Sequence, residues 1–142
     1  MDPVELAQTV YLGDRGCKSL LLDGWSDRIL IQVYPAISRI RDQSGEWRFY
    51  AAEDILDGLL VFSGIHSFSF NPLGRIPNDE IVSFSAEEYE MGDRQEKPRL
   101  YMFKLCIVSI GEERESDIVC VEIVAEQFHL EDPKEPTVQI RG

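Results

Sequence analysis

Two long stretches in the C-terminal half of the chain alternate between apolar and polar side chains, and this pattern limits how the chain can fold. They are Leu100–Ile110 and Asp117–His129, joined by the polar segment Gly111–Ser116. Successive side chains of a β-strand point to opposite faces of a sheet, so a period of two predicts strands with one buried face. In the second stretch that face carries Val119, Val121, Ile123 and Ala125. We therefore predict an antiparallel hairpin.

Strand and turn patterns recur along most of the remaining chain. Asp23–Asp27 carries Asp-Gly turn chemistry between two β-rich runs, and Asp42–Gly45 separates a second such pair. Leu59–Phe70 is the most apolar segment, and its Gly64 indicates a bulge or a close backbone contact. Ala51–Asp57 fits either a helical turn or a loop. The other predicted strands are Ser19–Leu22, Arg28–Tyr34, Ile37–Arg41, Glu46–Tyr50 and Ile81–Glu90.

The N-terminus predicts one short helix. Asp2 is a suitable N-cap, Pro3 fits the first helical position, and Glu5 completes a capping box. Gly13 is expected to end this helix.

These elements predict a mainly β fold with one short N-terminal helix. The strands are expected to form an antiparallel β-sandwich or a partly open barrel of about seven to nine strands. A chain of 142 residues fits a single domain. We expect the helix within residues 1–13, the β-domain over residues 19–129, and a loosely held tail over residues 130–142.

The formal net charge of −12 restricts the possible partners. Nucleic acids and anionic membrane surfaces are recognised through Lys and Arg, so neither is an expected partner. Residues 1–78 carry 10 acids and 7 bases, whereas residues 79–142 carry 16 acids and 7 bases. A charge of this sign favours a basic protein as partner.

The acidic residues are densest in Asp79–Glu96, which holds seven acids and one base. One interpretation is a charged strand edge and loop that resist edge-to-edge pairing. The other is a docking surface for a basic protein, with Phe84 and Tyr89 as apolar anchors. The candidate partner-binding residues are Glu87, Glu88, Tyr89, Glu90, Asp93 and Glu96.

The three cysteines do not suggest a disulfide framework, because their number is odd and their spacing is wide. Cys106 and Cys120 lie in apolar strand-like runs, where we expect small buried thiols. The N-terminus has neither a basic region nor a long apolar stretch, so no secretory signal is expected. Both observations favour a reducing compartment, and we predict a cytoplasmic protein.

No catalytic, cofactor or metal motif stands out, and we predict a protein that is not an enzyme. His66 and His129 are far apart, and even with Cys17 they show no zinc-ligand spacing. A hydrolase that uses one of these histidines as general base is the least favoured alternative. A small-ligand-binding sandwich or barrel is a second alternative, since Trp25, Trp47, Phe62, Phe68 and Phe70 could line a pocket or simply form core.

Several short phrases resemble an uncharacterised family of small bacterial proteins. They are Tyr11–Arg15, Cys17-Lys18, Asp23–Trp25, Ile40-Arg41, Ser44-Gly45 and Trp47. The resemblance implies no activity and no site residue. Small acidic β-domains recur among immunity proteins of toxin systems, so we expect an immunity-type or inhibitory protein that binds a basic partner. A homodimer through a sheet edge is a further alternative.

Overall fold

The computed structural model describes residues 1–43, 46–49, 51–90, 98–111 and 117–142, with side chains described for all of these except residues 42, 43 and 46–49. Most of this chain forms a six-stranded antiparallel sheet in the order β2-β3-β7-β10-β9-β8. Its strands are β2 Gly16–Asp23, β3 Arg28–Tyr34, β7 Leu59–Asn71, β8 Ile81–Tyr89, β9 Leu100–Ser109 and β10 Asp117–Glu131.

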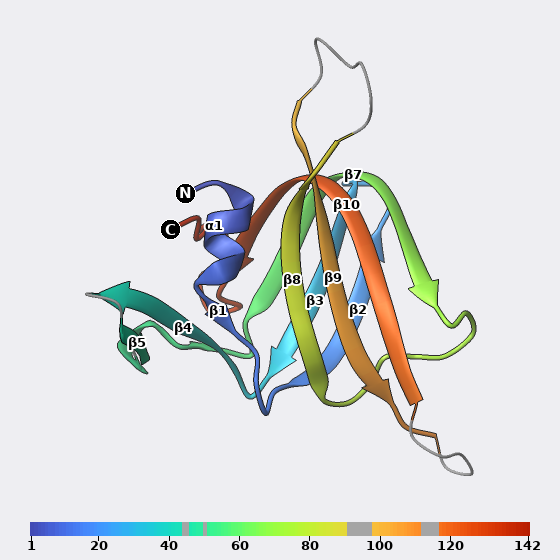
Figure 1. The fold of residues 1–142 in the computed structure, drawn as a ribbon, viewed down its shortest axis with the longest axis horizontal. Coiled ribbons are helices and arrows are strands. Elements are labelled where there is room, and N and C mark those ends of the chain that lie inside the picture. Colours follow the sequence, from blue (N-terminus) through green and yellow to red (C-terminus); the bar gives the residue numbers. More distant parts are fainter. Residues whose placement is uncertain (44–45, 50, 91–97, 112–116) are drawn as a thin grey trace.

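A smaller antiparallel sheet extends from one side of the molecule (Figure 1). Its order is β1-β4-β5, and β6 pairs with β4. The strands are β1 Val10–Tyr11, β4 Ala36–Gln43, β5 Glu46–Phe49 and β6 Ile55–Leu56. The ambiguous segment before β7 therefore contains a short 3-10 turn, Ala51–Glu53, followed by β6.

The six-stranded sheet curls because β7 and β10 each contribute to two layers of it. Only the first part of β7, Leu59–Ser63, pairs with β3. Only the first part of β10, Asp117–Ala125, pairs with β9. At one end, Gly16 of β2 forms a bridge with Glu80, directly before β8, so the two edge strands approach one another. The described strands do not close into a barrel. The prediction of a mainly β, partly open architecture is confirmed.

The predicted hairpins are confirmed where the structure describes them. β2 pairs with β3 across the Asp23–Asp27 turn, β4 pairs with β5, and β9 pairs with β10. Within the described residues there are eight strands longer than two residues, which falls within the predicted range. The end of the predicted tail contacts β10, because Ile140 and Leu130 exchange two backbone hydrogen bonds of 2.8 and 2.9 Å.

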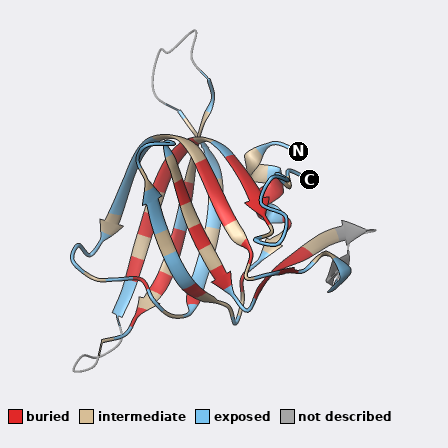
Figure 2. Cartoon of the chain, turned by 180° about the vertical axis from the view of Figure 1, so that it is seen from behind, coloured by how far each residue is buried: buried red, intermediate tan, exposed pale blue. Residues whose placement is uncertain are grey.

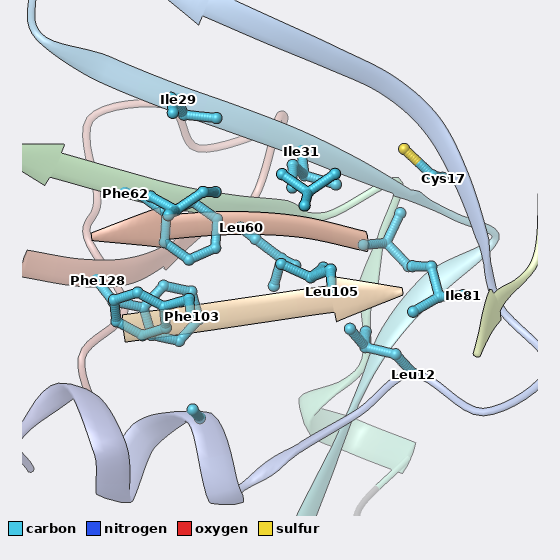
Figure 3. Packing of buried hydrophobic residues seen from close by; sticks show 14 of the residues in the cluster. Leu12, Cys17, Ile29, Ile31, Leu60, Phe62, Ile81, Phe103, Leu105 and Phe128 are labelled. Atoms are coloured by element: carbon cyan, nitrogen blue, oxygen red, sulfur yellow. The ribbon is translucent and has the colours of Figure 1, made fainter. Parts of the chain in front are cut away.

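The core lies on the concave side of the curled sheet. Buried and exposed residues alternate along its strands (Figure 2). Val119, Val121 and Ile123 of β10 are all buried there, as the period of two predicts. Three aromatic rings meet at its centre, and Figure 3 shows them together: Phe62, Phe103 and Phe128. Burial of such rings is the largest single source of stability in a core of this kind.

The N-terminal helix α1, Pro3–Gln8, has the predicted capping box. The Asp2 side chain accepts a hydrogen bond from the backbone N–H of Glu5, and the Glu5 side chain accepts one from the N–H of Asp2. Its buried face, Leu6 and Ala7, packs where α1 contacts β8 and β10.

The predicted end of the helix at Gly13 is wrong. Thr9 is already the C-cap, and Val10–Tyr11 forms a strand that pairs with Ser38 and Arg39 of β4. Thr9 keeps helical backbone angles and its N–H still bonds to the helix, but its carbonyl already accepts a hydrogen bond from the N–H of Ile40. β-Branched Val10 favours extended backbone, and pairing with β4 stabilises that conformation.

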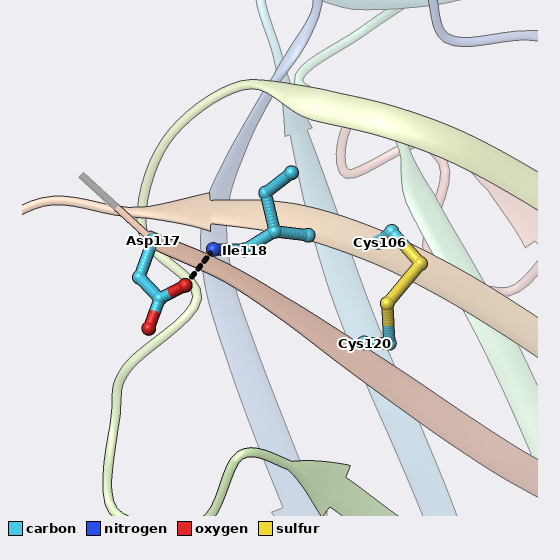
Figure 4. The surroundings of a disulfide bond; sticks show 4 residues. All are labelled: Cys106, Asp117, Ile118 and Cys120. Atoms are coloured by element: carbon cyan, nitrogen blue, oxygen red, sulfur yellow. Dashed lines mark hydrogen bonds between the residues drawn. A yellow bond between two sulfur atoms is a disulfide. The ribbon is translucent and has the colours of Figure 1, made fainter.

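The structure contradicts the prediction that Cys106 and Cys120 are separate thiols. The two residues lie directly opposite one another in the β9–β10 register and form a disulfide, with Cα atoms 4.0 Å apart (Figure 4). Counting spacing along the chain misses this pair because the hairpin, and not the local sequence, brings the two cysteines together. Cys17 is a free, buried thiol, and burial raises its pKa to about 11.

The bend of β7 depends on Gly64, as the sequence suggests. Its φ angle is +64°, a left-handed conformation that other residues avoid. A Cβ atom built there would lie 2.9 Å from Cβ of Glu126 on β10. The β7–β10 register shifts nearby, between Val124 and Ala125. Glycine thus permits the close approach of the two bent strands.

We expect Gly64→Ala to lower the free energy of unfolding by about 2 kcal/mol, mainly through the left-handed backbone and in part through the contact with Glu126. Gly74→Ala separates the two causes, since Gly74 also has a positive φ of 87° but nothing within 4 Å of its Cβ position. Gly24→Ala, with neither feature, should change stability least. Urea unfolding of the three variants measures the order, and equal effects at all three glycines would contradict this explanation.

Candidate partner-binding surface

The predicted acidic residues lie at the C-terminal end of β8, which is an edge strand of the six-stranded sheet. Glu87, Glu88 and Glu90 are exposed and Tyr89 is half-buried. Ile81 and Phe84 of the same strand face the core. Asp93 and Glu96 lie outside the described residues. The structure therefore places four of the six candidates next to one another along one segment.

Alternation along β8 divides these four residues between two faces. Glu87 and Tyr89 follow Ser85 on the convex side of the sheet, away from the core, whereas Glu88 follows Ala86 on the other side. The Glu88 carboxylate lies 3.9 Å from Nε of Arg99, and both side chains are well exposed. A pair of this kind contributes little to stability, so Glu88 remains free to meet a partner.

Glu87 also borders a shallow hollow on the convex face of β8, β9 and β10. The residues around it are Ser85, Ala86, Glu87, Met102, Lys104 and Glu122. Ser85, Lys104 and Glu122 form one row across the three strands, because Lys104 is the register partner of both neighbours. Two carboxylates thus accompany one ammonium group, and the hollow carries net negative charge. An arrangement of this kind can bind Lys or Arg side chains of another molecule.

The aromatic residues considered for a ligand pocket do not gather. Trp25 is fully exposed in the β2–β3 turn, whereas Phe62 is fully buried in the core. Phe68 and Phe70 contact one another in the second part of β7, with ring centroids 5.9 Å apart. The Trp47 side chain lies outside the described side chains. The described aromatic side chains therefore do not form the shared pocket on which the small-ligand interpretation depends.

The two histidines lie in different environments. His66 is exposed at the bend of β7, whereas the His129 side chain on β10 is 2% exposed. His129 Nε2 lies 2.7 Å from the Glu131 carboxylate, which also lies 4.0 Å from Nη1 of Arg28. The other ring nitrogen, Nδ1, is buried and has no hydrogen-bond partner among the described residues. Since neither ring nitrogen of His129 faces solvent, it is poorly placed to act as a general base.

Burial lowers the pKa of His129 below its usual value, although the hydrogen bond that the Glu131 carboxylate accepts from the ring acts in the opposite direction. The unfolded chain therefore binds a proton at a higher pH than the folded chain does. Stability linked to His129 is complete above the unfolded pKa and is lost as pH falls through that value.

We expect the free energy of unfolding of the wild type to fall between about pH 7.5 and about pH 5, in part through His129. His129→Gln should show a shallower fall, and His66→Gln, which alters an exposed ring, should follow the wild type. Urea unfolding at several pH values gives the three slopes. Equal slopes for the wild type and His129→Gln would contradict the assignment.

No group of three or more His, Cys, Asp or Glu residues in the described part of the chain could hold a metal ion. Among the same residues, no helix is both long enough and apolar enough to cross a membrane.

Comparison with protein-family models places the chain in a known family. The model of a family of unknown function, DUF6258, matches residues 1–142. No match was found among curated proteins or among solved structures.

Proposed function

Because the chain belongs to the DUF6258 family over its whole length, and that family carries no assigned activity, we propose its function from the surface itself. The protein is a small acidic binding domain, of an immunity or inhibitory type, that docks a basic protein partner. The observation that carries this proposal is the acidic patch, which we define as Glu87, Glu88, Glu90 and Glu122. It adjoins Tyr89 at the edge of the sheet, with Glu87 and Glu122 on the convex face and Glu88 on the opposite face.

Two physical arguments support docking at the acidic patch. A chain with a net charge of −12 attracts basic molecules at long range and speeds their encounter. At short range, Tyr89 and Met102 provide apolar surface beside the carboxylates, and hot spots commonly combine such contacts. The proposal requires no catalytic group.

Affinity capture with a matched control variant tests the proposal. The purified protein is immobilised and exposed to extract of its own host at low salt, and captured proteins are quantified by mass spectrometry. Glu87→Gln, Glu88→Gln and Glu90→Gln are combined in one variant. The control combines Asp14→Asn, Asp54→Asn and Glu135→Gln, three exposed carboxylates elsewhere that match the loss of charge.

We expect a basic protein that the wild type and the control retain and that the acidic-patch variant loses. If the two variants lose the same proteins to the same extent, binding depends on total charge and the patch is not the site. If the wild type retains no basic protein, the proposed function is wrong.

A further inference from the structure

The second part of β7, Ile65–Asn71, has one unpaired edge. On one side this segment pairs with β10, but β3 pairs with β7 only as far as Ser63. No described strand lies beside its other side, and Figure 1 shows it as the outermost arrow of the sheet. Unpaired backbone N–H and C=O groups on such an edge can pair with another strand.

This edge lacks the usual protection against strand pairing. Its sequence, Ile-His-Ser-Phe-Ser-Phe-Asn, contains no Lys, Arg, Asp, Glu or Pro. The other two edges of the same sheet differ. β2 carries Lys18 and a register shift beside it, and β8 carries Glu87 and Glu88 and contacts α1. Charged side chains on an edge hinder pairing with another strand, and Ile65–Asn71 has none.

The register shows which backbone groups face outward. The Cα atoms of Cys106 and Cys120 are 4.0 Å apart, closer to the roughly 4.5 Å of a non-hydrogen-bonded pair than to the roughly 5.5 Å of a hydrogen-bonded one. Cys120 therefore directs its N–H and C=O toward its other neighbour, Asn71 of β7. Since these directions alternate along a strand, Phe68 and Phe70 direct theirs toward the open edge.

We propose that Ser67–Asn71 is a homodimer interface, on which a second copy of this chain adds its own β7 in antiparallel register about Ser69. The sequence Phe68-Ser69-Phe70 reads the same in both directions, so a two-fold axis at Ser69 places Phe68 opposite Phe70 of the second copy, twice. Both residues direct their N–H and C=O groups outward, which allows four interchain hydrogen bonds. The dimer joins the layer that contains the second part of β7, β10, β9 and β8 in one copy to the same layer in the other.

Side-chain chemistry also favours a second copy as the occupant. Phe68 is 44% exposed, and its ring would be covered by an aromatic ring of the partner strand. The edge segment itself carries no charge that would attract a basic partner, whereas two identical edges are complementary as they stand. The short paired segment lies at the small end of stable interfaces, so the dimer is weak and forms at micromolar concentrations.

The two copies carry the same large negative charge, so added salt should strengthen the dimer by screening their repulsion. Binding of a basic protein at the acidic patch should weaken under the same change. Opposite salt effects thus separate this inference from the proposed function, and either can fail without the other.

Analytical ultracentrifugation of two oppositely charged Ser69 variants tests both the interface and its register. Ser69 lies at the two-fold axis, so Ser69→Lys places two cations opposite one another and Ser69→Glu places two anions there. Each variant alone should dimerise roughly fivefold more weakly than the wild type, or worse, because like charges directly opposite one another destabilise a strand pair. An equimolar mixture of the two should recover dimerisation. Ser83→Lys, at an exposed position of the edge strand β8, serves as control and should match the wild type.

Three results would overturn the inference. They are a wild type that stays monomeric up to high micromolar concentration, a Ser69→Lys variant that dimerises as the wild type does, and a mixture that shows no recovery. A dimer that Ser83→Lys disrupts and Ser69→Lys does not would place the contact on the β8 edge instead.

Discussion

Replacing Phe128 with alanine is expected to lower the free energy of unfolding by about 3 to 5 kcal/mol. The side chain is 1% exposed, and its ring lies within 5.1 Å of Phe62, 5.2 Å of Phe103 and 5.8 Å of Phe84, measured between centroids. These contacts join β7, β8, β9 and β10. The cavity left by the substitution therefore opens in the core between the two layers of the six-stranded sheet. Urea unfolding at low protein concentration measures the loss.

Two further variants define the cause of that loss. Phe128→Leu keeps most of the volume and should cost less than about 1.5 kcal/mol. Phe68→Ala removes a ring that is 44% exposed and contacts only Phe70 among the described rings, so its effect should be the smallest. A loss at Phe128 no larger than that at Phe68 would contradict the central place of this ring in the core.

Removing the disulfide has the second large effect. Cys106 and Cys120 are 14 residues apart, and closing a loop of that length in the unfolded chain stabilises the folded state by about 3 kcal/mol. The double variant Cys106→Ser, Cys120→Ser should therefore unfold at lower urea than the oxidised wild type. A reducing agent should shift the wild type toward the variant and leave the variant unchanged.

Counting thiols in the unfolded protein provides the control for this prediction. The oxidised wild type should contain one reactive thiol, from Cys17, and the reduced protein three. Three thiols in protein purified without a reducing agent would contradict the bond. A cytoplasmic location stays a prediction, and in a reducing cytoplasm the cysteine pair would be present as thiols.

Local patterns in the sequence predict most of the strands correctly. Alternation places Val119, Val121 and Ile123 on the buried face of β10, and the Asp-Gly turn separates β2 from β3. The capping residues fix the start of α1. These features depend on neighbours within a few residues, so the sequence alone is enough to find them.

The features that the sequence does not predict depend on contacts between distant residues. The end of α1 depends on pairing between Val10 and Arg39, and the disulfide depends on the hairpin register. The buried pair of His129 and Glu131 is hidden in the same way. The two residues are separated by one position on β10, but their burial becomes visible only in the folded chain.

For the same reason, local sequence predicts only part of the candidate surface. The density of acids after Asp79 identifies Glu87, Glu88 and Glu90. Glu122 and Lys104, which share the hollow with Glu87, come from two other strands. The predicted alternation of β10 places Glu122 on the exposed face, but only the strand order places it beside Glu87. Local sequence does not predict that order.

The most direct test of the proposed function is the salt dependence of binding to the captured partner, purified and measured by calorimetry. We expect the wild type to bind several-fold more weakly at about 300 mM salt than at about 50 mM, because the shorter Debye length screens the acidic patch. The Glu87→Gln, Glu88→Gln, Glu90→Gln variant should bind weakly at both salt concentrations. A wild-type affinity that does not change with salt, and that this variant retains, would contradict an acidic docking surface.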